Sequence, residues 1–552
     1  MRRSGIEVLA LLCSAVMVLG LRAQEPEVPS GFTRQDVLRG SITEERSWWD
    51  VQHYELSVEF FPETKRIAGS NAITFTALAD GSRMQVDLQP PLAVTRVSLR
   101  DEELEFEREG NVYWVTLADP IAKGESRTVT VSYEGRPLQS SRPPWSGGLS
   151  WRRDRDGDPF IATTCQGIGA SIWWPNKDHG YDEPDRGMDI RATVPEALTA
   201  VANGRLVEVS ADEEAETRTF HWRVTNPINN YCVNINVAKY VSIQSTYEGE
   251  AGQLDLEYWV LESQREDAER QFAEVPRTLE AFEHWFGAYP FYEDSYKLVV
   301  VPYLGMEHQS SVTYGNGFRN GYRGRDLSGT GVGLKFDFII VHESAHEWWG
   351  NNVSMVDVAD MWIHESFANY AENLFVDYHF SSEEAADYVI GCRALIQNDR
   401  PIIGTYGVNN SGSGDMYYKG GNMLHTMRMI VDDDDRWRGA LRGINEQFRH
   451  RTVATDEIES FLSERCDFDF GPLFDQYLRT TDIPLLVQEV EGKQVALSFE
   501  DVVEGFEIPV RITVGDDVRR VLVGSERVVV DFDVPIESIE VDRSYYIRSE
   551  RR

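Results

Sequence analysis

Residues 341–350 carry the pattern His-Glu-x-x-His inside a proline-free, mostly apolar stretch that is expected to be helical. Residues four apart share one face of a helix, so His342 and His346 can direct their imidazoles at one metal ion. Glu343 is turned about 100° round the helix and stands beside that ion, where a general base is needed. The pattern therefore predicts a metal-binding helix. Because four letters recur by chance, an ordinary structural helix is the alternative.

A third ligand is predicted further along the chain, since eighteen residues separate His346 from Glu365. Glu365 lies in a helix-favouring segment that follows Asp360, the expected N-cap. Two histidines and one carboxylate leave the fourth position of zinc open, as in catalytic rather than structural sites. His308 and His364 are other conceivable ligands. On a helix His364 would point about 100° away from Glu365, so we interpret it as a packing or supporting residue.

The rest of the chain predicts a multidomain α+β protein, because 552 residues exceed what one hydrophobic core fills. Short β-like runs such as 54–60, 71–76 and 127–133 indicate an antiparallel β domain. A change of period then indicates a helix over 262–286, a strand at 297–301 and helices over 337–477. The expected domains are a signal peptide at 1–23, a lead segment at 24–47, an N-terminal β domain at 48–248, a mixed α/β domain at 249–482 and a small β-sandwich-like domain at 483–552.

The N-terminus has the features of a secretory signal. Arg2 and Arg3 supply charge, residues 8–21 form an apolar run, and Ala23 offers a cleavage point. This run is shorter than the roughly 20 residues that span a bilayer, and no later stretch qualifies. We expect an exported protein, whether periplasmic, cell-surface or secreted, with no membrane span after cleavage. An uncleaved anchor is the alternative.

The charge balance excludes some partners. With 54 basic and 91 acidic residues the net charge is −37, which argues against nucleic acid and anionic membrane surfaces. An acidic surface poor in lysine suits a salt-rich medium. The sequence has no Cys-x-x-Cys pair, so a thiolate zinc site is not expected. The spacings of Cys165, Cys232, Cys392 and Cys466 permit disulfides but do not demand them.

The two histidines, the eighteen-residue gap and Glu365 within Trp-Ile-His-Glu-Ser-Phe-Ala (362–368) resemble the zinc signature of the aminopeptidase N family, which also includes leukotriene-hydrolase-type enzymes. The resemblance covers most of the chain. It implies one zinc ion per chain, held by His342, His346 and Glu365, with Glu343 as general base. It also implies a saddle-like N-terminal β domain, a thermolysin-like catalytic domain and a short form without the large helical C-terminal domain.

Residues 304–308, Leu-Gly-Met-Glu-His, resemble the family loop Gly-x-Met-Glu-Asn. This implies that Gly305 and Met306 bind substrate and that Glu307 binds its free α-amine, with His308 where the family usually has Asn. Thr-Cys-Gln at 164–166 resembles the segment whose Gln or Glu also meets the amine, which implies that role for Gln166. Tyr303 stands where relatives place a residue lining the pocket for the first side chain.

Residues 417–420, Tyr-Tyr-Lys-Gly, resemble the family pattern Tyr-x-Lys-Gly. This assigns to Tyr417 a hydrogen bond to the developing oxyanion, which a protonated phenol can donate. The implied partners are peptides with a free N-terminus, and a homo-oligomer is left open. Three rival functions remain: an endopeptidase without amine capture, a catalytically silent peptide-binding protein, and a leukotriene-type epoxide hydrolase. The last is disfavoured by Asn409, which stands where those enzymes carry Asp.

Overall fold

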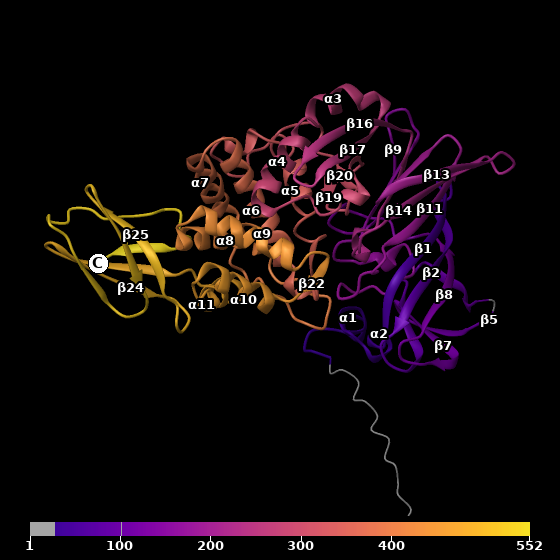
Figure 1. The fold of residues 1–552 in the computed structure, drawn as a ribbon, viewed down its shortest axis with the longest axis horizontal. Coiled ribbons are helices and arrows are strands. Elements are labelled where there is room, and N and C mark those ends of the chain that lie inside the picture. Colours follow the sequence, from indigo (N-terminus) through magenta and orange to yellow (C-terminus); the bar gives the residue numbers. More distant parts are fainter. Residues whose placement is uncertain (1–27, 101) are drawn as a thin grey trace, which may run out of the picture.

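The computed structural model describes residues 28–100 and 102–552. The predicted signal peptide and the first four residues of the lead segment lie outside these ranges. Figure 1 shows three blocks along the long axis of the molecule. The N-terminal β domain is at one end, a helix-rich central domain follows, and a small β domain forms the other end. The predicted α+β multidomain fold is confirmed.

The N-terminal domain is built around an eight-stranded sheet. In its central strand every second residue, from Tyr54 through Leu56 and Val58 to Phe60, is buried, so one face of the sheet supplies the core. The strands lie in the order β13 (Arg205–Asp212), β14 (Thr217–Val224), β11 (Met188–Pro195), β1 (Trp49–Phe61), β2 (Arg66–Ala77), β8 (Ser126–Gly135), β4 (Ala93–Leu99) and β5 (Glu102–Glu103).

One pair in this sheet departs from the antiparallel expectation, because β1 and β11 run parallel. Side chains alternate with the same period in both arrangements, so the sequence pattern does not distinguish them. Two smaller sheets and two short helices complete the domain: β3 (Gly81–Asp87), β7 (Val112–Ile121) and β6 (Glu105–Glu109); β12 (Thr199–Ala202), β15 (Ile235–Ala238), β10 (Pro159–Thr164) and β9 (Gly148–Arg153); α1 (Arg34–Gly40) and α2 (Glu44–Ser47).

The central domain begins with a five-stranded sheet in the order β16 (Tyr240–Gly249), β17 (Gly252–Leu261), β18 (Tyr296–Val300), β20 (Val312–Tyr314) and β19 (Gly305–Met306). The expected strand at 297–301 corresponds to β18. The expected domain boundary at 248/249 falls inside β16, which pairs with β17 over its whole length. Residues 240–249 are thus joined by hydrogen bonds to the central sheet.

Helices cover this sheet and form most of the central domain (Figure 1). They are α3 (Arg265–Gln271), α4 (Glu274–Phe286), α5 (Phe338–Ala345), α6 (Trp362–His379), α7 (Ser382–Gly391), α8 (Tyr418–Val431), α9 (Asp434–Gln447), α10 (Thr455–Cys466) and α11 (Gly471–Arg479), with the two-stranded pair β21 (Val353–Met355) and β22 (Arg451–Val453) beside them.

Two local expectations are corrected. The single helix expected over 262–286 is broken between α3 and α4, because the ring of Pro276 is incompatible with a helical carbonyl at Phe272, four residues earlier. Asp360 does not cap α6. The first turn of α6 directly follows a short 3-10 turn, and α6 itself has no side-chain cap. The Asp360 carboxylate instead accepts hydrogen bonds from the hydroxyls of Thr455, at 2.6 Å, and Tyr406, at 2.5 Å.

The C-terminal domain packs two sheets, in the orders β27-β24-β23-β29 and β26-β25-β28. The strands are β23 (Leu485–Glu491), β24 (Gln494–Glu500), β25 (Ile508–Val514), β26 (Asp517–Val523), β27 (Val528–Asp531), β28 (Glu540–Val541) and β29 (Arg548–Arg551).

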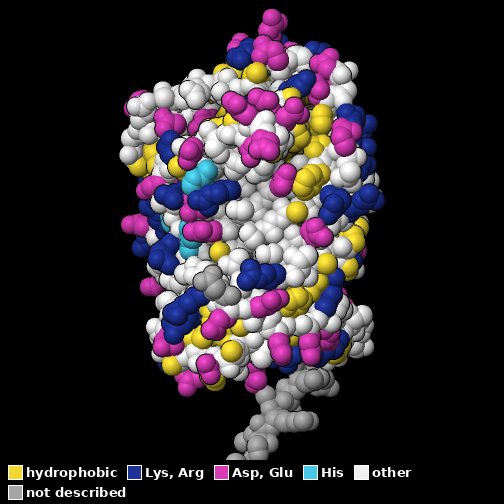
Figure 2. Space-filling model, turned by 90° about the vertical axis from the view of Figure 1, so that its right-hand side faces the viewer, with side chains coloured by type: hydrophobic (Ala, Val, Ile, Leu, Met, Phe, Trp, Pro, Cys, Tyr) yellow, Lys and Arg dark blue, Asp and Glu magenta, His cyan; other side chains and the backbone are white. Residues whose placement is uncertain are grey.

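The described part of the chain contains no helix with the length and apolar character needed to cross a bilayer. Cys165, Cys232, Cys392 and Cys466 are buried free thiols. Figure 2 shows the face of the molecule at the N-terminal domain end, where acidic and basic side chains are interspersed and no large basic patch is present.

Candidate active site

Helix α5 presents the His-Glu-x-x-His segment and is anchored at its N-terminus. The Asp337 carboxylate accepts hydrogen bonds from the backbone N–H groups of Ile339, at 3.1 Å, and Ile340, at 3.4 Å. The same carboxylate accepts the Tyr314 hydroxyl at 2.8 Å, which ties the helix to β20. Every residue of α5 is buried. The helix therefore holds its side chains at fixed positions relative to the central sheet.

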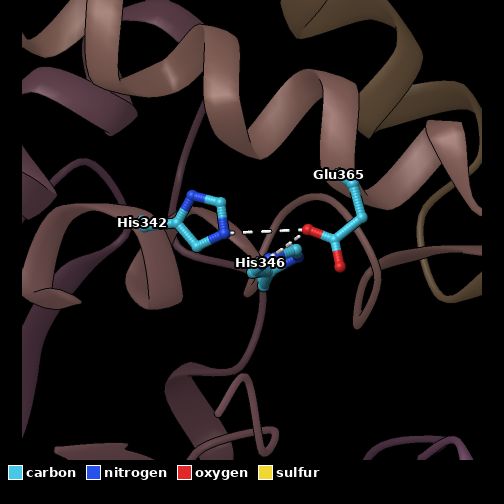
Figure 3. A group of neighbouring side chains, drawn as sticks. All are labelled: His342, His346 and Glu365. Atoms are coloured by element: carbon cyan, nitrogen blue, oxygen red, sulfur yellow. Dashed lines mark ion pairs between the residues drawn. The ribbon is translucent and has the colours of Figure 1, made fainter. Parts of the chain in front are cut away.

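The three predicted metal ligands converge (Figure 3). Glu365, in the first turn of α6, places Oε2 3.6 Å from His342 Nε2 and 3.5 Å from His346 Nε2. Two donors that each lie about 2.1 Å from a tetrahedral zinc are about 3.4 Å apart. Among the described residues this buried Glu365 oxygen has no hydrogen-bond partner, as expected for an atom reserved for a cation. The donor set therefore fits zinc with one open position.

Supporting hydrogen bonds orient both imidazoles. His342 Nδ1 lies 2.8 Å from a carboxylate oxygen of Glu372, and His346 Nδ1 lies 2.8 Å from the carbonyl oxygen of Trp349. Both contacts place the proton on Nδ1, which leaves each Nε2 lone pair free for the metal. Glu372 is in turn held by the Tyr388 hydroxyl, at 2.5 Å.

Glu372 was not identified from the sequence, although a signal was present. It follows Glu365 by seven residues, two turns of α6, so the two carboxylates share the helix face that meets α5.

The two carboxylates closest to the histidines have pKa values shifted in opposite directions. Burial raises the pKa of Glu343 to about 8, against the pull of the His342 charge. Burial also acts to raise the pKa of Glu365, but the His342 and His346 imidazoles next to its carboxylate override it and hold this pKa well below its ordinary value. A bound divalent cation would lower the Glu343 pKa from this raised value toward neutrality or below. Glu365 is thus a permanently charged ligand, and Glu343 is a group able to exchange a proton.

A carboxylate and an amide lie directly beside the ligand set. Gln166, which follows β10, donates its Nε2 to Glu307 at 2.6 Å and to Glu365 Oε1 at 2.9 Å. Glu307 is 2% exposed, and its carboxylate is close to those of Glu343 and to His346. Burial raises the pKa of Glu307. A free ammonium placed here would supply the positive charge that this acidic group lacks.

Gly305 lets the loop before Glu307 approach α5 closely. A β-carbon at this position would lie 2.7 Å from Ile339 Cγ2 and 2.9 Å from Glu343 Oε1, so any larger residue would collide with the base or its neighbour. Gly305 and Met306 form β19, the edge strand of the central sheet. An edge strand of this kind can pair with an extended peptide.

Tyr417 also contacts the ligand set. Its hydroxyl donates a hydrogen bond to Glu365 Oε1 at 2.7 Å, and its ring lies 6.1 Å from that of His342. Burial holds its pKa well above the ordinary value, so the phenol stays protonated. Tyr418 also lines the cleft, but Tyr417 is the residue whose hydroxyl reaches a ligand.

Three other sequence candidates occupy supporting positions. The prediction that Tyr303 lines the cleft is wrong. Tyr303 is buried in a small apolar cluster with Met306, and its hydroxyl donates to the Thr163 carbonyl at 2.9 Å. His308 is fully buried away from the ligand set, and burial lowers its pKa to about 3. His364 is also buried and accepts the Met355 backbone N–H at Nε2, at 3.0 Å, which confirms its supporting role.

The cleft above the ligand set has a volume of about 270 Å³. Its lining combines the polar groups described above with apolar and aromatic residues. The apolar and aromatic lining residues could not be assigned a role from the sequence, because their spacing in the chain carries no pattern. These are Pro144, Trp145, Tyr322, Phe338, Ile339 and Tyr418.

Comparisons with known proteins agree with this geometry. Residues 270–477 match the model of the Peptidase family M1 domain. The chain is 22% identical to human aminopeptidase B over 484 residues, which cover 78% of this chain and 69% of that protein. It is 21% identical to leucyl aminopeptidase of Saccharolobus solfataricus over 89% of this chain and 62% of that protein. It is 21% identical to leukotriene A-4 hydrolase of Xenopus laevis over 75% of this chain and 68% of that protein.

The chain thus spans between 62% and 69% of the length of these three relatives. Among solved structures, an M1 zinc metallopeptidase from Deinococcus radiodurans, a mutant bound to a Tyr-Ser-Ala substrate, superposes with a TM-score of 0.67 at 20% identity. The match covers 81% of this chain and 98% of that structure, which shows that the two share a fold.

Proposed function

Since residues 270–477 form a Peptidase family M1 domain, we propose that this chain is a zinc-dependent aminopeptidase that hydrolyses the N-terminal residue from peptides. The observation that carries the proposal is the position of Gln166, whose amide bonds both Glu307 and the metal ligand Glu365. An ammonium bound by Glu307 is therefore separated from the metal site by only the first residue of the substrate. The first peptide bond is then the one presented for cleavage.

The residues of the chain divide the reaction between them. Glu307 and Gln166 hold the substrate ammonium, and the edge of β19 aligns the backbone. Glu343 accepts the proton of the attacking water and delivers it to the leaving amine. Tyr417 donates a hydrogen bond to the carbonyl oxygen as negative charge develops there. When bound by His342, His346 and Glu365, zinc supplies Lewis-acid polarisation and lowers the pKa of water toward about 7.

Export is part of the proposal. It rests on the charged, apolar and small-residue pattern of residues 1–23. A periplasmic, cell-surface or secreted location would expose the enzyme to peptides outside the cytoplasm. Its substrates would be peptides with a free N-terminus. Nucleic acid would not be a partner.

The test compares aminoacyl chromogenic substrates with the same compounds N-acetylated. We expect purified protein to contain one zinc per chain, to lose activity on chelation and to regain it with zinc. We also expect N-acetylation to abolish hydrolysis, because it removes the charge that Glu307 binds. Equal hydrolysis of blocked substrates would identify an endopeptidase instead. Protein that binds no metal and cleaves neither substrate would be a silent peptide-binding protein.

A further inference from the structure

An unusually exposed tryptophan stands at the mouth of the cleft. Trp145 is 54% exposed, although an indole normally buries most of its surface. It is presented by a tight turn, in which the Ser146 backbone N–H donates to the Arg142 carbonyl at 3.0 Å and the Arg142 N–H donates to Ser146 Oγ at 2.8 Å. The Arg142 guanidinium lies over the indole, 5.1 Å from its centre. The ring is therefore held in place while it faces solvent.

The same cleft is lined by two aromatic rings of the central domain. Phe338, the first residue of α5, stacks on the ligand His342 with ring centres 5.3 Å apart. Tyr322 meets Phe338 edge to face at 5.4 Å. Trp145 lines the same cavity as this pair. All three rings line the same cavity as the metal ligands.

The direction of the bound peptide follows from the order of groups along β19. Glu307 fixes the amine at one end. Gly305, two residues back, lies against Glu343 and Ile339, so the bond to be broken lies there. Glu307 lies beside His346, whereas Phe338 is about two helical turns earlier, at the start of α5, and is therefore further from Glu307. A peptide that begins at Glu307 and passes Glu343 therefore brings its second residue to the three rings.

We propose that Trp145, Tyr322 and Phe338 form the binding site for the residue that follows the cleaved bond, and that they select peptides with an aromatic or large aliphatic second residue. The inference rests on the proposed function. Trp145 belongs to the N-terminal domain, whereas Tyr322 and Phe338 belong to the central domain. The site therefore exists only when the two domains are docked together. Trp145 is the specificity-determining residue, because it contributes the exposed surface that a substrate side chain would cover.

The test uses free-amine tripeptides Ala-X-Ala, with X as Phe, Leu, Gly or Asp, and measures kcat/KM. Wild-type protein is expected to prefer Phe and Leu over Gly by about tenfold, the effect of one well-filled apolar contact. Trp145→Ala is expected to remove most of this preference, while the rate for X = Gly changes by less than about twofold. Trp145→Phe should restore much of the preference.

The matched control is Leu522→Ala, which truncates a 49% exposed side chain on the C-terminal domain and should leave all four rates unchanged. A Phe-to-Gly ratio that is the same in Trp145→Ala as in wild type would overturn the inference while leaving the aminopeptidase function intact. Failure of the wild type to cleave any of the four tripeptides would overturn the proposed function, and this inference with it.

Discussion

Glu343 and Glu365 are both buried beside the same two histidines, yet their environments assign them different roles. The two imidazoles next to the Glu365 carboxylate keep it ionised, whereas burial raises the pKa of Glu343 to about 8. Pairs of carboxyl groups whose pKa values are pushed apart separate ligand from acid–base function. The difference of one helix position from His342 is what turns Glu343 aside.

Replacing Glu343 tests this division of roles. Glu343→Gln keeps the shape of the side chain but removes its ability to accept a proton. We expect turnover to fall by about 10²- to 10⁴-fold, the usual contribution of a general base, while one zinc per chain is retained. Metal analysis and steady-state kinetics on the same preparation provide the check. Full turnover in this variant would refute Glu343 as the base.

At the scale of elements, α5 depends on its N-terminal anchor. Asp337 satisfies two backbone donors of α5 and also accepts hydrogen bonds from Tyr314, at 2.8 Å, and Asn316, at 2.8 Å. These contacts link the metal-binding helix to β20 and to the loop after it. The position of both histidines therefore depends on one buried carboxylate.

Asp337→Ala is expected to lower the free energy of unfolding by about 2–4 kcal/mol, because several buried donors lose their acceptor. It should also weaken zinc binding, since the helix is no longer held against the sheet. Ser381→Ala is the control, because it removes the Oγ cap of α7, which accepts the Glu384 N–H at 3.2 Å, away from the ligands. That change should cost about 1 kcal/mol and leave zinc affinity unaltered. Denaturant unfolding and zinc competition measure both effects, and unchanged zinc affinity in Asp337→Ala would contradict the argument.

At the scale of the whole molecule, a net charge of −37 repels itself in the compact state. Added salt screens this repulsion, because the Debye length falls from about 30 Å at 0.01 M to about 3 Å at 1 M. We expect the thermal midpoint to rise by several degrees between low salt and about 0.5 M NaCl.

Sodium sulfate at matched ionic strength separates the possible causes. Screening predicts the same shift for both salts, whereas exclusion of sulfate from the protein surface predicts a larger one. A midpoint that stays constant or falls in NaCl would show that self-repulsion does not limit stability and would remove the case for adaptation to salt.

The sequence by itself predicted the ligand set His342, His346 and Glu365, which the structure brings together, the positions of several strands and the α+β class. These features depend on local periodicity, and side chains four apart on a helix meet wherever that helix is packed. Two local predictions were wrong. Pro276 divides the helix expected at 262–286, and the Asp360 carboxylate accepts the hydroxyls of Tyr406 and Thr455 instead of capping α6.

Only the tertiary structure decided which distant residues meet at this site. Gln166 reaches Glu307 across 141 residues of sequence, and Trp145 lines the same cavity as Phe338 of another domain. Tyr303 stands close to Glu307 in the chain yet points away from the cleft. Such pairings depend on how sheets and helices dock, which is set by the burial of whole faces rather than by spacing along the chain. The catalytic metal site was therefore readable from the sequence, whereas the surface that would choose its substrate was not.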